Sequence, residues 1–211
     1  MNLVQKHITA VPQSVTPDER ARAAGHTGAV IWMSGLSGSG KSTLAMALQR
    51  ELFRRGMSAY VLDGDNIRSR LNSDLGFSAE HRTENLRRVA EVGRLFADAG
   101  TIVISAFISP SEADRERARE IVGPAFHDVH INADLATCES RDVKGLYAKA
   151  REGIVREFTG ISAPWEPPQA PDLVVDTMGN SLDASLAVLL NYVLHAVQPQ
   201  EAQALKAVGA R

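Results

Sequence analysis

A glycine-rich segment carries the clearest chemistry in this sequence. Residues 35–42 read Gly-Leu-Ser-Gly-Ser-Gly-Lys-Ser and match the pattern G-x-x-x-x-G-K-S/T in full. Gly38 and Gly40 let the backbone curl so that successive N–H groups point at phosphate oxygens. Lys41 can reach the β- and γ-phosphates of a nucleotide, and the Ser42 hydroxyl can bind Mg²⁺. Because the segment follows a strand pattern and precedes a helix pattern, it predicts nucleoside triphosphate binding.

Two aspartates, Asp63 and Asp65, follow a second strand pattern at residues 59–62. The carboxyl edge of a parallel sheet is where α/β proteins bind ligands. Phosphoryl transfer needs positioning, charge neutralisation and an oriented hydroxyl. We therefore expect Asp63 to lie nearest Mg²⁺ and the attacking hydroxyl, as a ligand of metal-bound water or as proton acceptor, and Asp65 to hold the acceptor. The alternative is that Asp63 only caps the following turn.

The signatures of two other classes of P-loop protein are absent from the sequence. There is no Asn-Lys-x-Asp motif of the kind that reads guanine in GTPases. The third predicted strand runs into residues 105–110, Ser-Ala-Phe-Ile-Ser-Pro, and not into the paired acids of an ATPase motor. The acid pair after the second strand, the many arginines and a lid-like segment favour a small-molecule kinase.

Alternating β-branched runs and helical stretches predict the elements that position these residues. The predicted strands are residues 29–33, 59–62, 102–104, 129–131 and 173–175. The predicted helices are residues 41–55, 83–99, 111–122 and 184–200. Ser111 with Asp114 three residues later predicts a capped start for the third of these helices. The pattern predicts an α/β fold, a P-loop NTPase-type parallel sheet with helices on both faces and a mobile lid.

Two segments break this alternation. Residues 144–171 hold three glycines and four prolines around Trp165, which is typical of a lid, a binding loop or disorder. Cations in this segment favour an anion-covering lid, with a solvated surface loop as the alternative. Residues 1–27 lack periodicity, as a flexible extension does. We therefore divide the chain into an N-terminal extension (1–27), a P-loop kinase domain (28–197) and a C-terminal tail (198–211).

Composition limits the partners and the compartment. The 211 residues suit one domain, and 23 Lys and Arg against 25 Asp and Glu give a net charge of −2. That balance argues against a chain that coats nucleic acid or an anionic membrane. Residues 184–200 have the spacing of an amphipathic packing helix, and the N-terminus has no apolar run of signal-peptide length. Cys138 is the single cysteine, so we expect a reducing, cytoplasmic location.

Seven blocks together resemble the adenylylsulfate (APS) kinase family, and they run in family order between about Gly28 and Thr177. The blocks are residues 35–43, 62–68, 75–78, 82–88, 107–110, 141–147 and 158–160. Asp-Gly-Asp-Asn at 63–66 and Arg-Asp-Val-Lys-Gly-Leu-Tyr at 141–147 are specific in combination. The resemblance implies transfer of the γ-phosphoryl group of ATP to the 3′-hydroxyl of APS in sulfate assimilation, giving 3′-phosphoadenylyl sulfate and ADP.

The resemblance also implies a set of site residues. The nucleotide-binding residues are Gly35, Leu36, Ser37, Gly38, Ser39, Gly40, Lys41, Ser42, Thr43 and Arg141. The substrate-binding residues are Asp65, Asn66, Arg68, Phe77, Arg82, Asn85, Ile108, Ser109, Lys144 and Phe158. The catalytic residues are Asp63, Lys41 and Ser109, with Ser42 and Asp63 at Mg²⁺. Arg68 and Arg82 offer forked donors to phosphosulfate oxygens. Phe77 and Phe158 suit stacking on adenine, although an isolated Phe is more often part of the core.

Ser109 has two interpretations. The family resemblance implies a phosphoserine intermediate at this position in bacterial members. The alternative is acceptor binding through the hydroxyl, since no base lies nearby in the sequence and in-line transfer needs no covalent stop. His81 departs from the family pattern, which commonly has an acid there. Ser111 and Trp165 depart from it too, each in place of a tyrosine.

The resemblance further implies a homodimer, and a separate ATP sulfurylase is the expected functional partner. The charge balance predicts no nucleic-acid or membrane partner. Two other functions remain open at this point. One is another small-molecule kinase, such as a nucleotide or sugar-acid kinase. The other is a nucleotide-binding regulatory module without turnover, against which the intact Lys41, Ser42, Asp63 and Asp65 argue.

Overall fold

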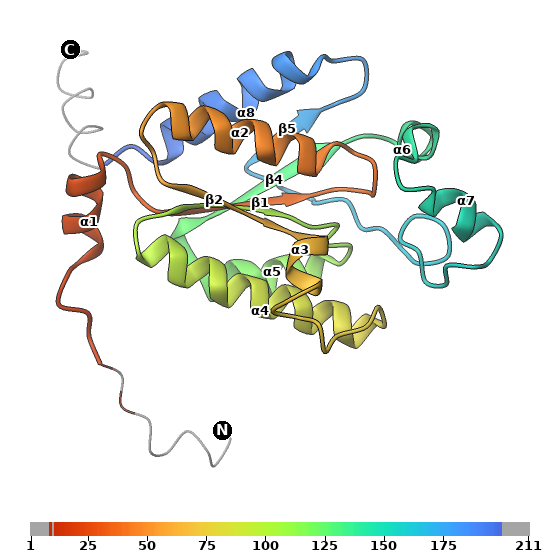
Figure 1. Ribbon diagram of the computed structural model, residues 1–211, viewed down its shortest axis with the longest axis horizontal. Coiled ribbons are helices and arrows are strands. Elements are labelled where there is room, and N and C mark those ends of the chain that lie inside the picture. The colour runs from red at the N-terminus through yellow and green to blue at the C-terminus, as the bar shows by residue number, and fades with distance from the viewer. Residues whose placement is uncertain (1–8, 10, 200–211) are drawn as a thin grey trace.

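A five-stranded parallel sheet forms the centre of the computed structural model, which describes residue 9 and residues 11–199 (Figure 1). Its strands are β1 (Ala29–Ser34), β2 (Ala59–Asp63), β3 (Ile102–Ala106), β4 (Phe126–Asn132) and β5 (Leu173–Asp176). Their order is β2-β3-β1-β4-β5, with every neighbouring pair parallel. The chain places β2 and β3 on one side of β1 and then crosses to the other side for β4 and β5. This reversal places a crevice at the carboxyl end of β1.

Helices cover both faces of the sheet. Helices α2 (Lys41–Arg54) and α8 (Leu182–Ala196) pack on one face, and α4 (Ala79–Asp98) and α5 (Glu112–Val122) pack on the other (Figure 1). All of β1 is buried, and its side chains alternate between the two cores, Ile31 toward α2 and Trp32 toward α4. The predicted α/β class with a parallel sheet and helices on both faces is confirmed.

The start of α4 differs from its prediction in position, and the start of α5 differs in how it is capped. Helix α4 begins at Ala79, four residues before the predicted 83, because the Ser78 hydroxyl caps it by accepting from the N–H of His81. That first turn buries no side chain and so gives no apolar periodicity. Helix α5 begins after Ser111 as predicted, but the Ser111 side chain makes no capping hydrogen bond. Glu166 supplies the cap instead, since its carboxylate accepts from the N–H of Glu112 at 2.7 Å.

The N-terminal segment contains a helix that the sequence patterns do not predict. Helix α1 (Pro17–Ala24) is capped at its N-terminus by a reciprocal capping box between Thr16 and Glu19. The segment after α1 is tied to the domain by His26, which is buried and accepts from the N–H of Ser58 at 3.2 Å. Helix α1 corrects the expectation that residues 1–27 lack regular structure. The division of the chain at 27 and 197 stays a prediction, and most of the tail lies outside the described residues.

Short helices gather beyond the carboxyl ends of the strands. They are α3 (Gly64–Arg68), α6 (Leu135–Arg141) and α7 (Leu146–Arg151), whereas a 3₁₀ turn at Gly123–Ala125 directly precedes β4. Helices α6 and α7 lie at the right of Figure 1, and α7 forms the first part of the predicted lid. A third apolar cluster, which includes Leu36, Cys138 and Phe158, packs this region against the P-loop. Across the described ranges, we find no helix with the length and apolar character needed to cross a membrane.

Candidate active site

A cavity of about 920 Å³ opens at the carboxyl ends of β1, β2 and β3. It brings together most of the predicted site residues from the P-loop, the loop after β2, α4, the loop after β3 and the 144–171 segment. Four predicted residues do not line it, namely Gly35, Leu36, Ser39 and Asn66. The first three form the hidden side of the P-loop, where their carbonyl and hydroxyl oxygens surround the Lys41 ammonium group.

The P-loop has the conformation that its glycines predict. Gly35, Gly38 and Gly40 all have positive φ, at 150°, 79° and 101°. A Cβ on Gly38 would lie 2.9 Å from the carbonyl oxygen of Cys138, so no larger residue fits there. Lys41 Nζ donates to the carbonyl oxygens of Gly35 and Leu36 at 2.8 and 2.7 Å. Burial lowers the pKa of Lys41 to about 8.

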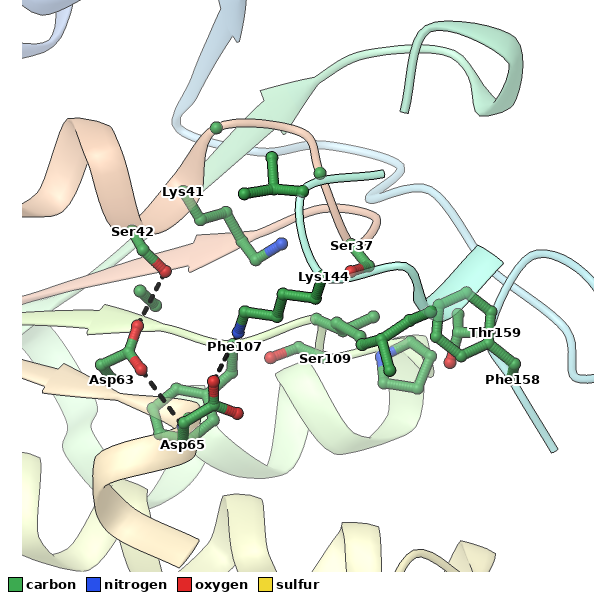
Figure 2. Close-up of a pocket in the computed structure, with 18 of the residues that line it drawn as sticks. Ser37, Lys41, Ser42, Asp63, Asp65, Phe107, Ser109, Lys144, Phe158 and Thr159 are labelled. Atoms are coloured by element: carbon green, nitrogen blue, oxygen red, sulfur yellow. Dashed lines mark hydrogen bonds and ion pairs between the residues drawn. The ribbon is translucent and has the colours of Figure 1, made fainter. Parts of the chain in front are cut away.

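Ser42 and Asp63 meet at the edge of the P-loop. Ser42 Oγ donates to Asp63 Oδ2 at 2.7 Å, and Asp63 Oδ1 accepts from the N–H of Asp65 at 3.1 Å (Figure 2). Asp63 therefore caps α3 with one oxygen, as the alternative interpretation expects, and faces the phosphate side with the other. A hydroxyl and a carboxylate this close are hard oxygen donors of the kind that Mg²⁺ binds together with nucleotide phosphates, so these residues fit the ion.

An ion pair crosses the middle of the cavity. The ammonium group of Lys144, from the predicted lid, bonds to Asp65 Oδ2 between the P-loop and Ser109 (Figure 2). Both side chains are more than half exposed, so the pair contributes little to stability. Lys144 can therefore leave Asp65 for a more highly charged partner.

Arg68 and Phe77 form one wall of the predicted acceptor side. Arg68 Nη1 donates to the carbonyl oxygen of Gly76 at 2.7 Å, and its guanidinium carbon lies 4.6 Å from the centroid of the Phe77 ring. Burial and the charge of Arg82 lower the pKa of Arg68. Phe77 is 67% exposed, so its ring stays accessible for stacking beside Arg68. His81, which was not predicted as a site residue, accepts from the N–H of Gly76 at 2.8 Å and so holds the same loop.

Arg82 joins α4 to the predicted lid. Its Nη1 donates to Thr159 Oγ1 at 3.2 Å, and its Nη2 donates to the carbonyl oxygen of Glu157. Phe158, between these two residues, is buried and packs edge-on against Tyr147 with 5.0 Å between ring centroids. The core interpretation of Phe158 therefore applies, although the residue also lines the cavity. Stacking of Phe158 on adenine stays a prediction.

Ser109 is held on two sides in the loop after β3. Its Oγ accepts from the indole N–H of Trp32 at 3.1 Å, and its carbonyl oxygen accepts from Arg115 Nη1 at 2.6 Å. Its φ of 48° lies in the left-handed region, and its side chain is buried. Asn85 is likewise buried, and its Oδ1 accepts from Asn72 Nδ2 at 2.9 Å. Ile108 lines the cavity beside these polar residues.

Arg141 supports the opposite end of the cavity, beside the P-loop. Its guanidinium group donates to the carbonyl oxygens of Gly38 and Thr177 at 3.1 and 2.7 Å. Thr177 was not predicted as a site residue, yet its hydroxyl donates to the carbonyl oxygen of Ser39 at 2.9 Å. Its position two residues after the predicted strand 173–175 is the signal that would have identified it. Cys138 is fully buried behind the P-loop, and burial raises the pKa of its thiol.

Comparison with known families and proteins agrees with this geometry. The family model for adenylylsulphate kinase matches residues 27–176. The adenylyl-sulfate kinase of Shewanella amazonensis is 53% identical over 189 residues, which cover 89% of this chain and 96% of the relative. The adenylyl-sulfate kinase of Geotalea daltonii is 53% identical over 188 residues, which cover 89% of this chain and 93% of the relative.

Solved structures show the same likeness. The APS kinase of Mycobacterium tuberculosis in complex with AMPPNP and APS matches with a TM-score of 0.76 and 46% identity, over 79% of this chain and 98% of that one. A sugar kinase from Janibacter matches with a TM-score of 0.57 at 20% identity, over 82% of this chain and 97% of that one, and shares the fold alone. From the family match, the close relatives and the P-loop cavity together, we conclude that the chain belongs to the adenylylsulphate kinase family.

Proposed function

We propose that the described cavity transfers the γ-phosphoryl group of ATP to the 3′-hydroxyl of adenylyl sulfate. The chain is an ATP-dependent kinase of adenylyl sulfate by family membership, so the proposal concerns which residues do the work. The observation that carries it is the series of contacts Ser42–Asp63–Asp65–Lys144, which runs across the cavity from the P-loop to the acceptor side (Figure 2). A reacting hydroxyl has to meet the γ-phosphate between these groups.

The P-loop side holds the nucleotide. Lys41 exchanges its contacts with the carbonyl oxygens of Gly35 and Leu36 for the β- and γ-phosphates, which are stronger partners for an ammonium group. The N-terminus of α2 adds the positive end of its dipole. Arg141 and Thr177 donate hydrogen bonds to carbonyl oxygens of the P-loop and so hold the loop beside the nucleoside.

Mg²⁺ is the cofactor that these residues would hold. Ser42 Oγ and Asp63 Oδ2 supply the protein side of its coordination, directly or through water. When bound, the ion neutralises charge on the β- and γ-phosphates as the transferred group leaves ADP. The contact between Asp63 Oδ2 and the P-loop residue Ser42 supports a place for this oxygen at the metal, while Oδ1 caps α3.

The acceptor side orients adenylyl sulfate. Asp65, which is more exposed than Asp63 and faces the middle of the cavity, fixes the acceptor, and Asp63 lies nearest the reacting hydroxyl. Lys144 then leaves Asp65 for the more highly charged phosphates and covers the transferred group. Arg68 and Arg82 balance the charge of the phosphosulfate, with Asn85 and Ile108 completing this side.

We further propose that transfer is direct and that Ser109 positions the acceptor. Its hydroxyl is buried and already accepts a hydrogen bond from Trp32, whereas a phosphoserine intermediate requires an exposed hydroxyl and an activating base. The Ser109→Ala variant tests this step. Turnover with no phosphorylated protein supports direct transfer, and complete loss of turnover with a phosphoenzyme in the parent chain refutes it.

Assembly and location are part of the proposal at a coarser level. We infer a homodimer, a cytoplasmic location and a separate ATP sulfurylase as functional partner from the family resemblance. The APS kinase of Thiobacillus denitrificans, which is 30% identical with a TM-score of 0.62, is hexameric, and this chain covers 31% of that longer chain. Light scattering on the purified protein distinguishes a dimer from other assemblies.

An acceptor panel tests the proposed function. Purified protein with Mg-ATP is offered adenylyl sulfate, AMP, or a sugar acid, and ADP is measured. ADP formation that depends on adenylyl sulfate supports the proposal. Faster turnover with a nucleotide or sugar-acid acceptor would replace it with the corresponding kinase, and ATP binding without turnover on any acceptor would indicate a regulatory module.

A further inference from the structure

A buried arginine lies behind the acceptor side, outside the cavity lining. Arg115, on α5, is only 1% exposed and is among the largest fully buried side chains of the described residues. A buried charge persists only where partners satisfy it. Its guanidinium group contacts the carboxylate of Glu112 and lies 5.7 Å from the Trp165 ring centroid. The phosphoryl-transfer scheme above does not use this residue.

Arg115 holds the backbone of Ser109 through a hydrogen bond. Arg115 Nη1 donates to the Ser109 carbonyl oxygen at 2.6 Å, while Trp32 holds the side chain of Ser109 from the other side. Ser109 has a φ of 48°, which a residue with a side chain adopts at a cost. Such a conformation persists only when its surroundings enforce it, and the guanidinium group is a rigid donor in the right place to do so.

The same guanidinium group fastens the end of the 144–171 segment to this loop. Arg115 Nη2 donates to the carbonyl oxygen of Glu166 at 2.7 Å, across 51 residues of sequence. Two further hydrogen bonds join the same two segments. The N–H of Glu166 donates to the Pro110 carbonyl oxygen at 2.9 Å, and the Glu166 carboxylate accepts from Glu112. The predicted lid therefore ends on the acceptor loop, with Arg115 at the junction.

We propose that Arg115 is a positioning residue for the acceptor: it fixes the backbone of Ser109 and ties the end of the lid to the acceptor loop. It touches neither substrate, so it acts through Ser109 and Glu166. This role rests on the proposed function, because it assumes that Ser109 belongs to the acceptor side. Lysine does not replace it, since an ammonium group lacks the two separate nitrogens with which Arg115 donates to Ser109 and Glu166.

The test compares Arg115→Lys with a matched variant one turn further along α5. Arg119 also pairs with carboxylates and lies over an aromatic ring, at 4.9 Å from the Phe126 centroid, but does not line the cavity. For Arg115→Lys we expect the KM for adenylyl sulfate to rise about tenfold or more, with the KM for ATP within about twofold of the parent. For Arg119→Lys we expect both KM values within about twofold.

Glu166→Ala provides a second variant that leaves the buried charge in place. Glu166 is exposed, so this variant folds, and losing its contact with Glu112 should raise the KM for adenylyl sulfate about threefold. A parallel rise of both KM values together with a lower Tm, or unchanged KM values, would overturn the positioning role. A parent chain without ADP formation on adenylyl sulfate would instead refute the proposed function, so the two failures are distinct.

Discussion

The two sides of the cavity hold their backbones in unusual conformations by different means. On the nucleotide side, positive φ angles fall on glycines, as at Gly38 and Gly40. On the acceptor side they also fall on two residues with side chains, Ser109 with a φ of 48° and Glu157 with a φ of 53°. The carbonyl oxygen of each of these two residues accepts a hydrogen bond from an arginine, Arg115 for Ser109 and Arg82 for Glu157. The nucleotide side is shaped by local sequence, and the acceptor side by contacts between distant segments.

This difference has a consequence for substitution. Gly38 of the P-loop faces backbone atoms of Cys138 that cannot move aside, so a change there should affect ATP binding and leave adenylyl sulfate binding unchanged. A change at an acceptor-side contact should do the reverse. Asp63 lies where the two sides join, so its replacement should affect turnover more than either binding step.

The largest effect is expected at this junction. Asp63→Asn keeps an oxygen for the N–H of Asp65 but removes the negative charge beside Ser42. We expect kcat to fall by about 10²–10³-fold, as when one electrostatic group that stabilises the transition state is lost. ATP affinity, measured by calorimetry, should stay close to that of the parent. Near-normal turnover would remove Asp63 from the reaction.

The next largest effect is expected on the nucleotide side. In Gly38→Ala the new Cβ would lie 2.9 Å from the Cys138 carbonyl oxygen, so the P-loop must shift. We expect the KM for ATP to rise by more than about tenfold with little change in the KM for adenylyl sulfate. Gly25→Ala is the control, because Gly25 has a similar φ of 72° with no atom within 4 Å. Equal effects on both KM values would contradict the separation of the two sides.

A smaller effect is expected at His81 on the acceptor side. His81→Leu removes the acceptor for the Gly76 N–H, which holds the loop that carries Phe77. We expect the KM for adenylyl sulfate to rise about three- to fivefold, since one neutral hydrogen bond is lost. His81→Asp keeps an acceptor at the same place and should behave like the parent. Steady-state kinetics with each substrate varied in turn would reveal an effect on ATP instead, which would count against this assignment.

The smallest effect on turnover is expected at Asp128 in β4, where the predicted change is in the stability of the folded state. Burial raises the pKa of Asp128 to about 6, and the charges of Arg115 and Arg119 offset part of that rise. A raised carboxyl pKa means that the folded state binds a proton that the unfolded state releases. The free energy of unfolding of the parent should therefore fall relative to Asp128→Asn as the pH rises from about 4 to 7, by no more than about 3 kcal/mol. Urea unfolding at several pH values measures this difference, and parallel profiles would contradict it.

The nucleotide side could be predicted from the sequence because its determinants are contiguous. The pattern at residues 35–42 specifies the turn, the helix start and the lysine within eight positions. Asp63 and Asp65 were also placed, because the end of a parallel strand fixes where its next residues lie. The resemblance supplied the acceptor residues, and the cavity brings nearly all of them together.

The contacts that hold the acceptor side could not be predicted, because they join segments far apart in the chain. Arg115 lies in a helix rich in acidic and basic residues, whose pattern is that of a solvated face. Nothing in the sequence pairs it with Ser109 and Glu166. Helices α6 and α7 were missed because each is short, and α1 because its stability comes from the capping box and not from apolar periodicity.

Product analysis gives the sharpest test of phosphoryl transfer to adenylyl sulfate. The protein is incubated with Mg-ATP while adenylyl sulfate is varied, and ADP and the phosphorylated product are quantified, with the position of the new phosphate read by phosphorus NMR. The account predicts that ADP and 3′-phosphoadenylyl sulfate form in equal amounts and that ADP formation rises with adenylyl sulfate until it saturates. ADP formation independent of adenylyl sulfate, or a phosphate at another position, would contradict it.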